Sequence, residues 1–106
     1  MVRAQPMAIN RPRNAESTDG QLVEQALADP AAFLEIFQRY QDPIFRYCHR
    51  CLGNRESAED ATQTTFMRAF SGLRSCKDRN RFHAWLFTIA HNVIVDTYRS
   101  SKPSSS

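Results

Sequence analysis

Apolar residues recur at steps of three and four along four stretches of this chain, which is the spacing of helices that bury one side. The first stretch is short, and the other three are long. No stretch alternates with a period of two, as a strand would. The sequence therefore predicts an all-α fold, a compact bundle of three long helices plus a short N-terminal helix. The expected helices cover residues 18 or 19 to 28, 30 to 52, about 57 to 70 or 73, and 82 to 99.

The second stretch carries the longest apolar stripe and clear signals at both ends. Asp29 can cap its start, and Pro30 suits the first helical position, where no backbone donor is needed. Pro43 lies inside, and we expect it to kink one helix rather than divide it, because the stripe continues in phase across it. Gly53 can end the helix in a left-handed conformation. The stripe consists of Phe33, Ile36, Phe37, Tyr40, Ile44, Tyr47, Cys48 and Cys51.

The third stretch separates into two different sides. Either Ser57, in a capping box with Asp60, or Asn54 can cap its start. One side is a continuous stripe of small and aromatic residues: Ala58, Ala61, Thr62, Thr65, Phe66, Ala69, Phe70 and Leu73. The other side offers a carboxylate, an amide, a hydroxyl and a thioether, from Asp60, Gln63, Thr64 and Met67. Such a side needs no burial in its own domain, so it is either a solvated face or a surface for a partner.

Residues 71–81 show no stripe and are rich in cations, so they predict a loop, after which Asp78 or Asn80 can cap the last helix. Phe66, Trp85, Leu86 and Ile89 are expected in the core, although Phe82 and Trp85 could instead stack on nucleic acid. A further strip of the last helix is unusually apolar for a surface. That strip consists of Phe87, His91, Ile94 and Tyr98.

Charge is distributed unevenly along the chain. Residues 17–73 hold five basic and eight acidic residues, whereas residues 74–102 hold six basic and two acidic ones. An acidic first half and a basic last third suit two different partners, the second of them anionic. Residues 1–16 have no periodicity and predict a flexible arm, residues 17–99 form the domain, and the serine-rich residues 100–106 predict a disordered tail at the start of a linker.

The cysteines are too few for a disulfide scaffold, and their number is odd. Cys48 and Cys51 fall on the apolar stripe, so we expect small buried side chains there rather than a redox or metal pair, and we expect no cofactor. No uncharged apolar run is long enough to cross a membrane, and the N-terminus lacks the apolar segment of a secretory signal. These features predict a cytoplasmic protein without membrane insertion.

Residues 58–66, Ala-Glu-Asp-Ala-Thr-Gln-Thr-Thr-Phe, resemble the Ala-Glu-Asp-Leu-Thr-Gln-Glu-Thr-Phe signature of extracytoplasmic-function (ECF) sigma factors of the sigma-70 family. Residues 82–99 resemble the family's Phe-x-x-Trp-Leu-x-x-Ile-Ala-x-Asn-x-x-x-Asp-x-x-Arg helix, which reads the minus-ten promoter element. Asp29-Pro30 with the aromatic residues that follow resembles the family's first long helix. The resemblance covers roughly residues 20–99 and identifies the chain as the region 2 domain.

The resemblance implies a domain that binds core RNA polymerase and recognises and melts the minus-ten element. Its partners would be the clamp helices of the largest polymerase subunit, the non-template DNA strand and an anti-sigma factor. The implied polymerase-binding residues are Glu59, Asp60, Gln63, Thr64 and Met67. The implied DNA-binding residues are Arg68, Cys76, Lys77, Asp78, Arg79, Asn80, Arg81, Trp85, Asn92, Asp96 and Arg99. Cations would follow the DNA backbone, and Asn92 can offer a donor and an acceptor to a base edge.

The sequence departs from the family at three points. Thr64 stands where glutamate is usual, so one polar contact to the clamp would differ. Cys76 stands where an aromatic residue is common, in the loop that shapes the base pocket. No segment resembles the family's second domain, a helix-turn-helix that reads the minus-thirty-five element, so we expect either an isolated promoter-melting domain or a truncated piece of a longer factor that contains one.

Two other classes of function stay open at this point. The apolar strip that includes Phe87 and Tyr98 could bind a helical partner in an interaction module without DNA function of its own. A metal-dependent enzyme could use Cys48, Cys51, His49, His83 and His91. The sequence shows no pairing of nucleophile and base, no phosphate loop and no zinc-binding helix motif, so we expect no enzyme.

Overall fold

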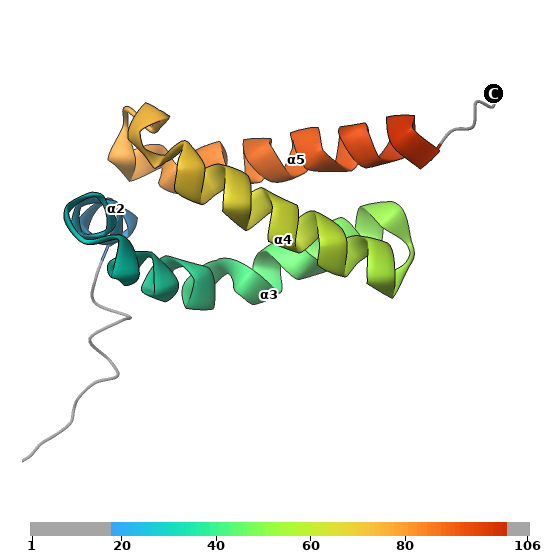
Figure 1. Cartoon of the computed structure of the whole chain (residues 1–106), viewed down its shortest axis with the longest axis horizontal. Coiled ribbons are helices and arrows are strands. Elements are labelled where there is room, and N and C mark those ends of the chain that lie inside the picture. The colour runs from blue at the N-terminus through green and yellow to red at the C-terminus, as the bar shows by residue number, and fades with distance from the viewer. Residues whose placement is uncertain (1–17, 102–106) are drawn as a thin grey trace, which may run out of the picture.

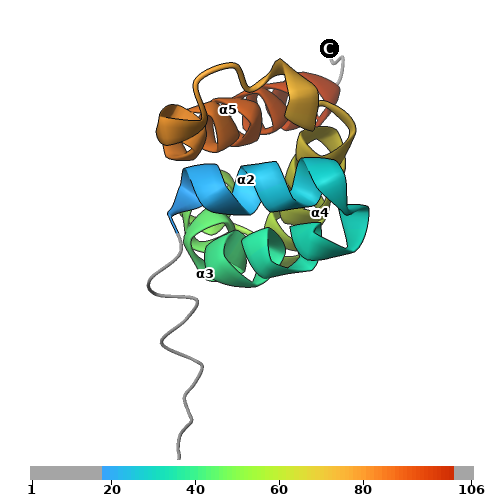
Figure 2. The ribbon, with the colours of Figure 1, turned by 90° about the vertical axis from the view of Figure 1, so that its left-hand side faces the viewer.

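The computed structural model describes residues 18–101, which form four α-helices and three short 3₁₀ helices. The long helices α3, α4 and α5 pack together, with α4 in contact with both of the others (Figure 1). The short helix α2 lies across one end of the bundle, between α3 and α5 (Figure 2). The predicted all-α bundle is therefore confirmed. The elements are α2 (Asp19–Ala28), η1 (Pro30–Ala32), α3 (Phe33–Leu52), α4 (Arg55–Ser71), η2 (Leu73–Ser75), η3 (Arg79–Arg81) and α5 (Phe82–Ser101).

The helix ends follow local side-chain chemistry. Thr18 and Gln21 form a capping box, in which the Thr18 hydroxyl accepts from the Gln21 amide at 3.1 Å and the Gln21 side chain accepts in return at 2.9 Å. Asn54, not Ser57, caps α4 by accepting from the backbone amide of Ser57 at 2.8 Å. Gly53 ends α3 with φ of 70°, the left-handed conformation expected for it.

Two elements differ from the sequence prediction. Asp29 and Pro30 begin the 3₁₀ helix η1, so α3 starts three residues later than expected, at Phe33. From there α3 runs as one helix through Pro43, as predicted. The expected loop over residues 71–81 contains η2 and η3, because this segment tightens into single turns that bury Leu73 and lead into α5.

The core is built where α4 meets its two neighbours. Ala58 and Ala69 are fully buried on α4, and their small side chains allow a close approach of the flanking helices. The Phe66 ring packs edge-on against Phe37, with ring centroids 5.0 Å apart. Thr65 is buried too, and its hydroxyl donates to the Ala61 carbonyl at 2.7 Å, which satisfies the polar group within the helix.

Six positions on the apolar stripes of α4 and α5 test the predicted core. Phe66 and Leu86 are buried as predicted, and Phe82, for which two readings were open, is buried with no exposed surface. Trp85 and Ile89 are only partly buried and pack against the edge of the core. Phe70 was expected on the buried stripe but is 49% exposed in the last turn of α4.

The ends of the chain fall partly outside the described range. The predicted flexible arm, residues 1–16, lies outside the described residues, as does the tail from residue 102. Ser100 and Ser101 belong to α5, so the expected disordered tail does not begin at residue 100. No helix within residues 18–101 is long and apolar enough to cross a membrane.

Candidate functional site

The outer side of α4 presents the side chains that the sequence assigned to a polymerase surface. Glu59, Asp60, Gln63 and Met67 are exposed, and Thr64 is partly exposed. Met67 has 69% of its surface in contact with solvent, which is unusual for a large apolar residue and marks a possible contact surface. The opposite side of the same helix is buried, so α4 holds this outer side in a fixed orientation on the core.

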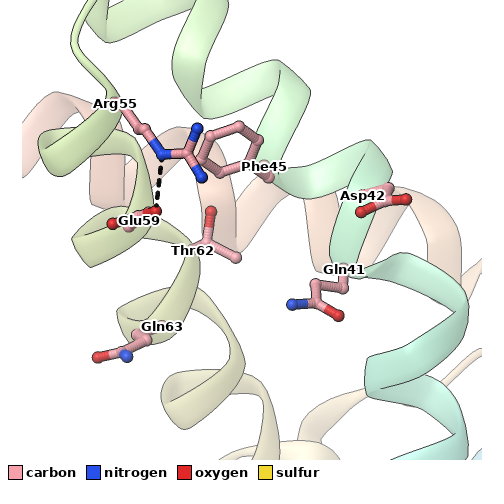
Figure 3. A pocket seen from close by; sticks show the side chains of 7 residues that line it. All are labelled: Gln41, Asp42, Phe45, Arg55, Glu59, Thr62 and Gln63. Carbon is pink, nitrogen blue, oxygen red and sulfur yellow. Dashed lines mark hydrogen bonds and ion pairs between the residues drawn. The ribbon is translucent and has the colours of Figure 1, made fainter.

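A groove of about 410 Å³ runs between α4 and α3 next to this surface (Figure 3). Gln63 and Glu59 lie on one wall, while Gln41 and Asp42 of α3 lie on the other. Arg55 pairs with Glu59 at 3.1 Å across one turn of α4, and the Asp42 carboxylate forms no ion pair within residues 18–101. The groove is lined by Gln41, Asp42, Phe45, Arg55, Glu59, Thr62 and Gln63.

The wall contributed by α3 was missed in the sequence analysis. Gln41 and Phe45 are one helical turn apart and lie beside the apolar stripe, a spacing that many solvated faces share. Only the packing of α3 on α4 brings them next to Gln63. In the sequence, this wall was indicated only by the polar pair Gln41 and Asp42 and by Phe45, at the edge of the long apolar stripe.

A second hollow, of about 250 Å³, joins the two predicted surfaces. Asp60 and Thr64 of the polymerase set line it from α4, and Asp96 of the DNA set lines it from α5. Arg68, also of the DNA set, donates to Asp96 at 3.2 Å across the two helices. Both partners of this ion pair are about half exposed, so its contribution to stability is small. The structure therefore brings together members of both sets that the sequence could only assign separately.

Residues 76–81 divide into inward and outward positions. Cys76 is buried, and its thiol lies 3.7 Å from the Asp78 carbonyl, so the side chain supports the segment from inside rather than facing a ligand. Arg79 also turns inward and pairs with Glu24 of α2. The Asp78 side chain accepts from the Asn80 amide at 3.1 Å and fixes the turn. The outward positions are Lys77, Asp78, Asn80 and Arg81.

One side of α5 carries three of the predicted DNA contacts in a line. Trp85, Asn92 and Arg99 are separated by seven residues each, two helical turns or about 10 Å. Asn92 and Arg99 are exposed, and Trp85 is partly exposed with its ring 5.5 Å from the buried Phe82 ring. This placement allows a partial stacking role for Trp85 while Phe82 stays in the core.

The apolar strip of α5 is not a free surface, because much of it packs against α3. Ile94 is 3% exposed and belongs to the core, which corrects its assignment to a surface strip. The Phe87 ring contacts Tyr47 of α3 at 5.6 Å, and the Tyr47 hydroxyl lies 3.4 Å from His91. Tyr98 donates to the Cys51 carbonyl near the end of α3. The ring and hydrogen-bond contacts of Phe87, His91 and Tyr98 described here are all to α3.

The thiols fit a structural role. Burial raises the pKa of the Cys48 thiol and of the Cys76 thiol above the ordinary value of 9.0, so both are protonated at neutral pH. Thiolate is the form that binds metals and attacks disulfides, so these two groups are poorly suited to either reaction. Within residues 18–101, no group of three or more acidic, cysteine and histidine residues is arranged to hold a metal ion.

The described geometry can be compared with known proteins. The family model for Sigma-70 region 2 matches residues 36–103. The ECF RNA polymerase sigma factor SigW of Bacillus subtilis is 40% identical over 75 residues, 71% of this chain and 40% of the relative. BldN of Streptomyces coelicolor is 39% identical over 84 residues, 77% of this chain and 32% of the relative. SigL of Mycobacterium tuberculosis is 35% identical over 78 residues, 73% of this chain and 44% of the relative.

The chain spans less than half the length of each of these curated relatives. The matched segment contains α4, residues 76–81 and α5, which carry every residue of the two predicted sets. The family model covers more than half of the chain, and the relatives agree with the resemblance seen in the sequence. The chain therefore belongs to the extracytoplasmic-function group of the sigma-70 family of RNA polymerase sigma factors, of which it contains region 2.

Proposed function

We propose that this chain binds core RNA polymerase through α4 and captures the non-template strand of the minus-ten promoter element with α5 and residues 76–81. The observation that carries the proposal is the hollow between α4 and α5, where Asp60 and Thr64 lie next to Arg68 and Asp96. A polymerase surface and a DNA surface that share one rigid border can hold the DNA in a fixed position on the enzyme.

The α4 side is suited to a cationic helical partner. Glu59 and Asp60 are exposed carboxylates, and Asp42 adds a third beside the groove. Amide groups from Gln63 and Gln41 can donate and accept across the same groove. Exposed Met67 adds an adaptable apolar contact at the next turn. We assign this surface to the clamp helices of the largest polymerase subunit.

The DNA side is suited to a single strand. Melting requires capture of bases that leave the stack, which needs cations for phosphates and planar or amide groups for bases. Lys77, Arg81 and Arg99 are exposed cations. Asn92 lies on α5, between Arg81, which directly precedes the helix, and Arg99 in its last turn. The DNA role also uses the partly exposed Trp85. No chemical step by this chain is part of the proposal.

Two further proposals concern the setting of this function. Polymerase and promoter DNA place the site of action in the cytoplasm. An anti-sigma factor would contact the part of the α5 strip that stays exposed, at His91 and Tyr98, of which Tyr98 is 51% exposed. That contact would compete with DNA or polymerase without changing the fold.

The experiment is a pull-down with core RNA polymerase of Bacillus subtilis, followed by crosslinking to single-stranded minus-ten DNA. Gln63→Arg should reduce polymerase binding by about 100-fold or more, because it places a cation in a groove that we assign to a cationic partner. Its helix content should be unchanged, since Gln63 is exposed.

Gln38→Arg is the matched control, because Gln38 is exposed on α3 and does not line the groove. Equal polymerase affinity for the parent and Gln63→Arg would contradict the assignment of α4. Polymerase binding without any crosslink to DNA would favour an interaction module instead.

A further inference from the structure

Helix α2 precedes the segment matched by the family model, which starts at residue 36, yet it is part of the folded unit. Its inner side is buried through Leu22, Val23 and Ala26. Asp19 fixes it to α3, since its carboxylate accepts from Arg39 at 3.2 Å and from the Tyr40 hydroxyl at 2.5 Å. Figure 2 shows α2 lying across the end of the bundle, between α3 and the start of α5. Helix α2 is therefore held against α3 at that end of the bundle.

Residues 79 and 80 pack against α2. The Arg79 guanidinium donates through Nη1 to the carboxylate of Glu24. Its Nε is buried and has no hydrogen-bond partner among the described residues, so that part of the side chain is turned away from solvent. The pair joins residues 55 positions apart and links α2 directly to η3.

Gly20, one turn before Glu24, lets the two segments approach closely. A Cβ at this position would lie 3.4 Å from Asn80 Oδ1 and 3.6 Å from Arg79 Cβ. A longer side chain would therefore press on residues 79 and 80. Gly20 and Glu24 thus both contact the segment, through Asn80 and Arg79, while Lys77 and Arg81 are exposed.

We propose that Arg79 is a positioning residue rather than a phosphate contact, and that Glu24 and Gly20 of α2 set the conformation of residues 77–81 and thereby the choice of base. This inference rests on the proposed function for its DNA part. The Glu24 carboxylate occupies Nη1 and neutralises the Arg79 guanidinium, and it would repel a DNA phosphate brought to the same group. Arg79 thus differs from Arg81, which is exposed and forms no ion pair within residues 18–101.

The test is a charge-reversal cycle made of Glu24→Arg, Arg79→Glu and the double variant. Glu24→Arg places two cations together, which should release residues 77–81 from α2. Hydrogen–deuterium exchange of the amides in this segment should then accelerate about tenfold, because local opening governs exchange. The double variant should restore slow exchange. Glu56→Arg, at an exposed position on α4, is the control for the change in net charge.

The second readout is base preference. Each variant is bound to core polymerase of Bacillus subtilis and used to select from a pool of short single-stranded DNA with randomised sequence. Glu24→Arg should broaden the selected bases, and the double variant should restore the parental preference. Arg79→Ala should broaden preference but leave the slope of log affinity against log salt unchanged, since no phosphate contact is lost.

Two results would overturn the inference. One is a double variant that still binds DNA as poorly as Arg79→Glu alone, with a reduced salt slope, which would make Arg79 a phosphate contact. The other is unchanged exchange in Glu24→Arg, which would show that α2 does not hold the segment. A parent chain that selects no DNA would contradict the proposed function, while the exchange measurement would still decide whether α2 positions residues 77–81.

Discussion

The outer side of α4 and the outer side of residues 77–81 are both candidate contact surfaces, but they are built in different ways. On α4, exposed residues follow one another at helical steps, and each one's direction is set by the buried residues on the same helix. In residues 77–81, Arg79 at the centre of the segment is oriented by a distant partner, Glu24 of α2. The first surface is organised locally, and the second only by the packed domain.

Substitutions on the two surfaces should therefore have different effects. A substitution on the outer side of α4 should act on its own contact and leave neighbouring side chains in place. A substitution of Cys76 or Arg79 should shift several exposed side chains of residues 76–81 together, because these two residues attach the turn to the rest of the domain. The outer cations are expected to act individually.

The largest expected effect is on the core that supports both surfaces. Leu86 has no exposed surface, so Leu86→Ala should lower the free energy of unfolding by about 2–5 kcal/mol. Trp85→Ala should lower it by less than a full burial would imply, since the ring is partly exposed. Urea denaturation of both variants tests whether Leu86→Ala is the more destabilising of the two. If Trp85→Ala were the more destabilising, the assignment of the two positions would be reversed.

The next effect concerns the groove beside α4. Asp42→Lys should weaken binding to core polymerase about tenfold, because it replaces one carboxylate of the proposed surface by a cation. Binding to single-stranded DNA should not change. Titration with labelled core polymerase measures the first and anisotropy the second, with the exposed Glu56→Lys as control. An equal loss in Asp42→Lys and Glu56→Lys would reduce the effect to net charge and exclude α3 from the interface.

A smaller effect is expected from the outer cation at residue 81. Arg81→Ala should weaken binding to all single-stranded DNA sequences alike and reduce the salt slope by about 0.7, the value for one phosphate contact on a single strand. Base preference should stay as in the parent. Swapping Lys77 and Asp78, with buried Cys76 retained, removes the Asp78 cap on Asn80 and reshapes the segment, so base preference should change instead. A swap that lowers every sequence equally would mean that this segment only positions the strand.

The smallest expected effect is a loss of stability at alkaline pH, caused by two buried thiols, Cys48 and Cys76. Burial raises the folded-state pKa of Cys48, beside Thr62 of α4, and of Cys76, below the loop. The stability from these protonated thiols is complete below the unfolded pKa of 9.0 and is lost as pH rises through the folded pKa.

Urea denaturation should therefore show constant stability from neutral pH to about pH 8 and a decline above about pH 9. Cys48→Ala and Cys76→Ala should each make the decline shallower, whatever their effect at neutral pH. Parallel curves for the parent and both variants would show that other groups, such as the buried Tyr40, cause the loss.

Most of the fold was predictable because its signals are local. Stripes at helical spacing predicted the helices, and Gly53 and Thr18 fixed two of their ends through conformations and hydrogen bonds that involve only nearby residues. The exposed side of α4 followed from the same spacing, since the buried stripe on a helix defines its opposite side. The errors lie where packing against other segments decides burial, as for Phe70 in the last turn of α4 and Ile94 on α5.

The sequence by itself therefore determined the helices, the family and the outer side of α4, because all three depend on the order of residues within one segment. The tertiary structure alone decided which side chains from different segments meet. It placed Gln41 and Asp42 beside Gln63, paired Arg68 with Asp96 and turned Arg79 toward Glu24. Residue spacing carries no information about such contacts, because the distance between two helices is set by the shape and volume of the side chains packed between them.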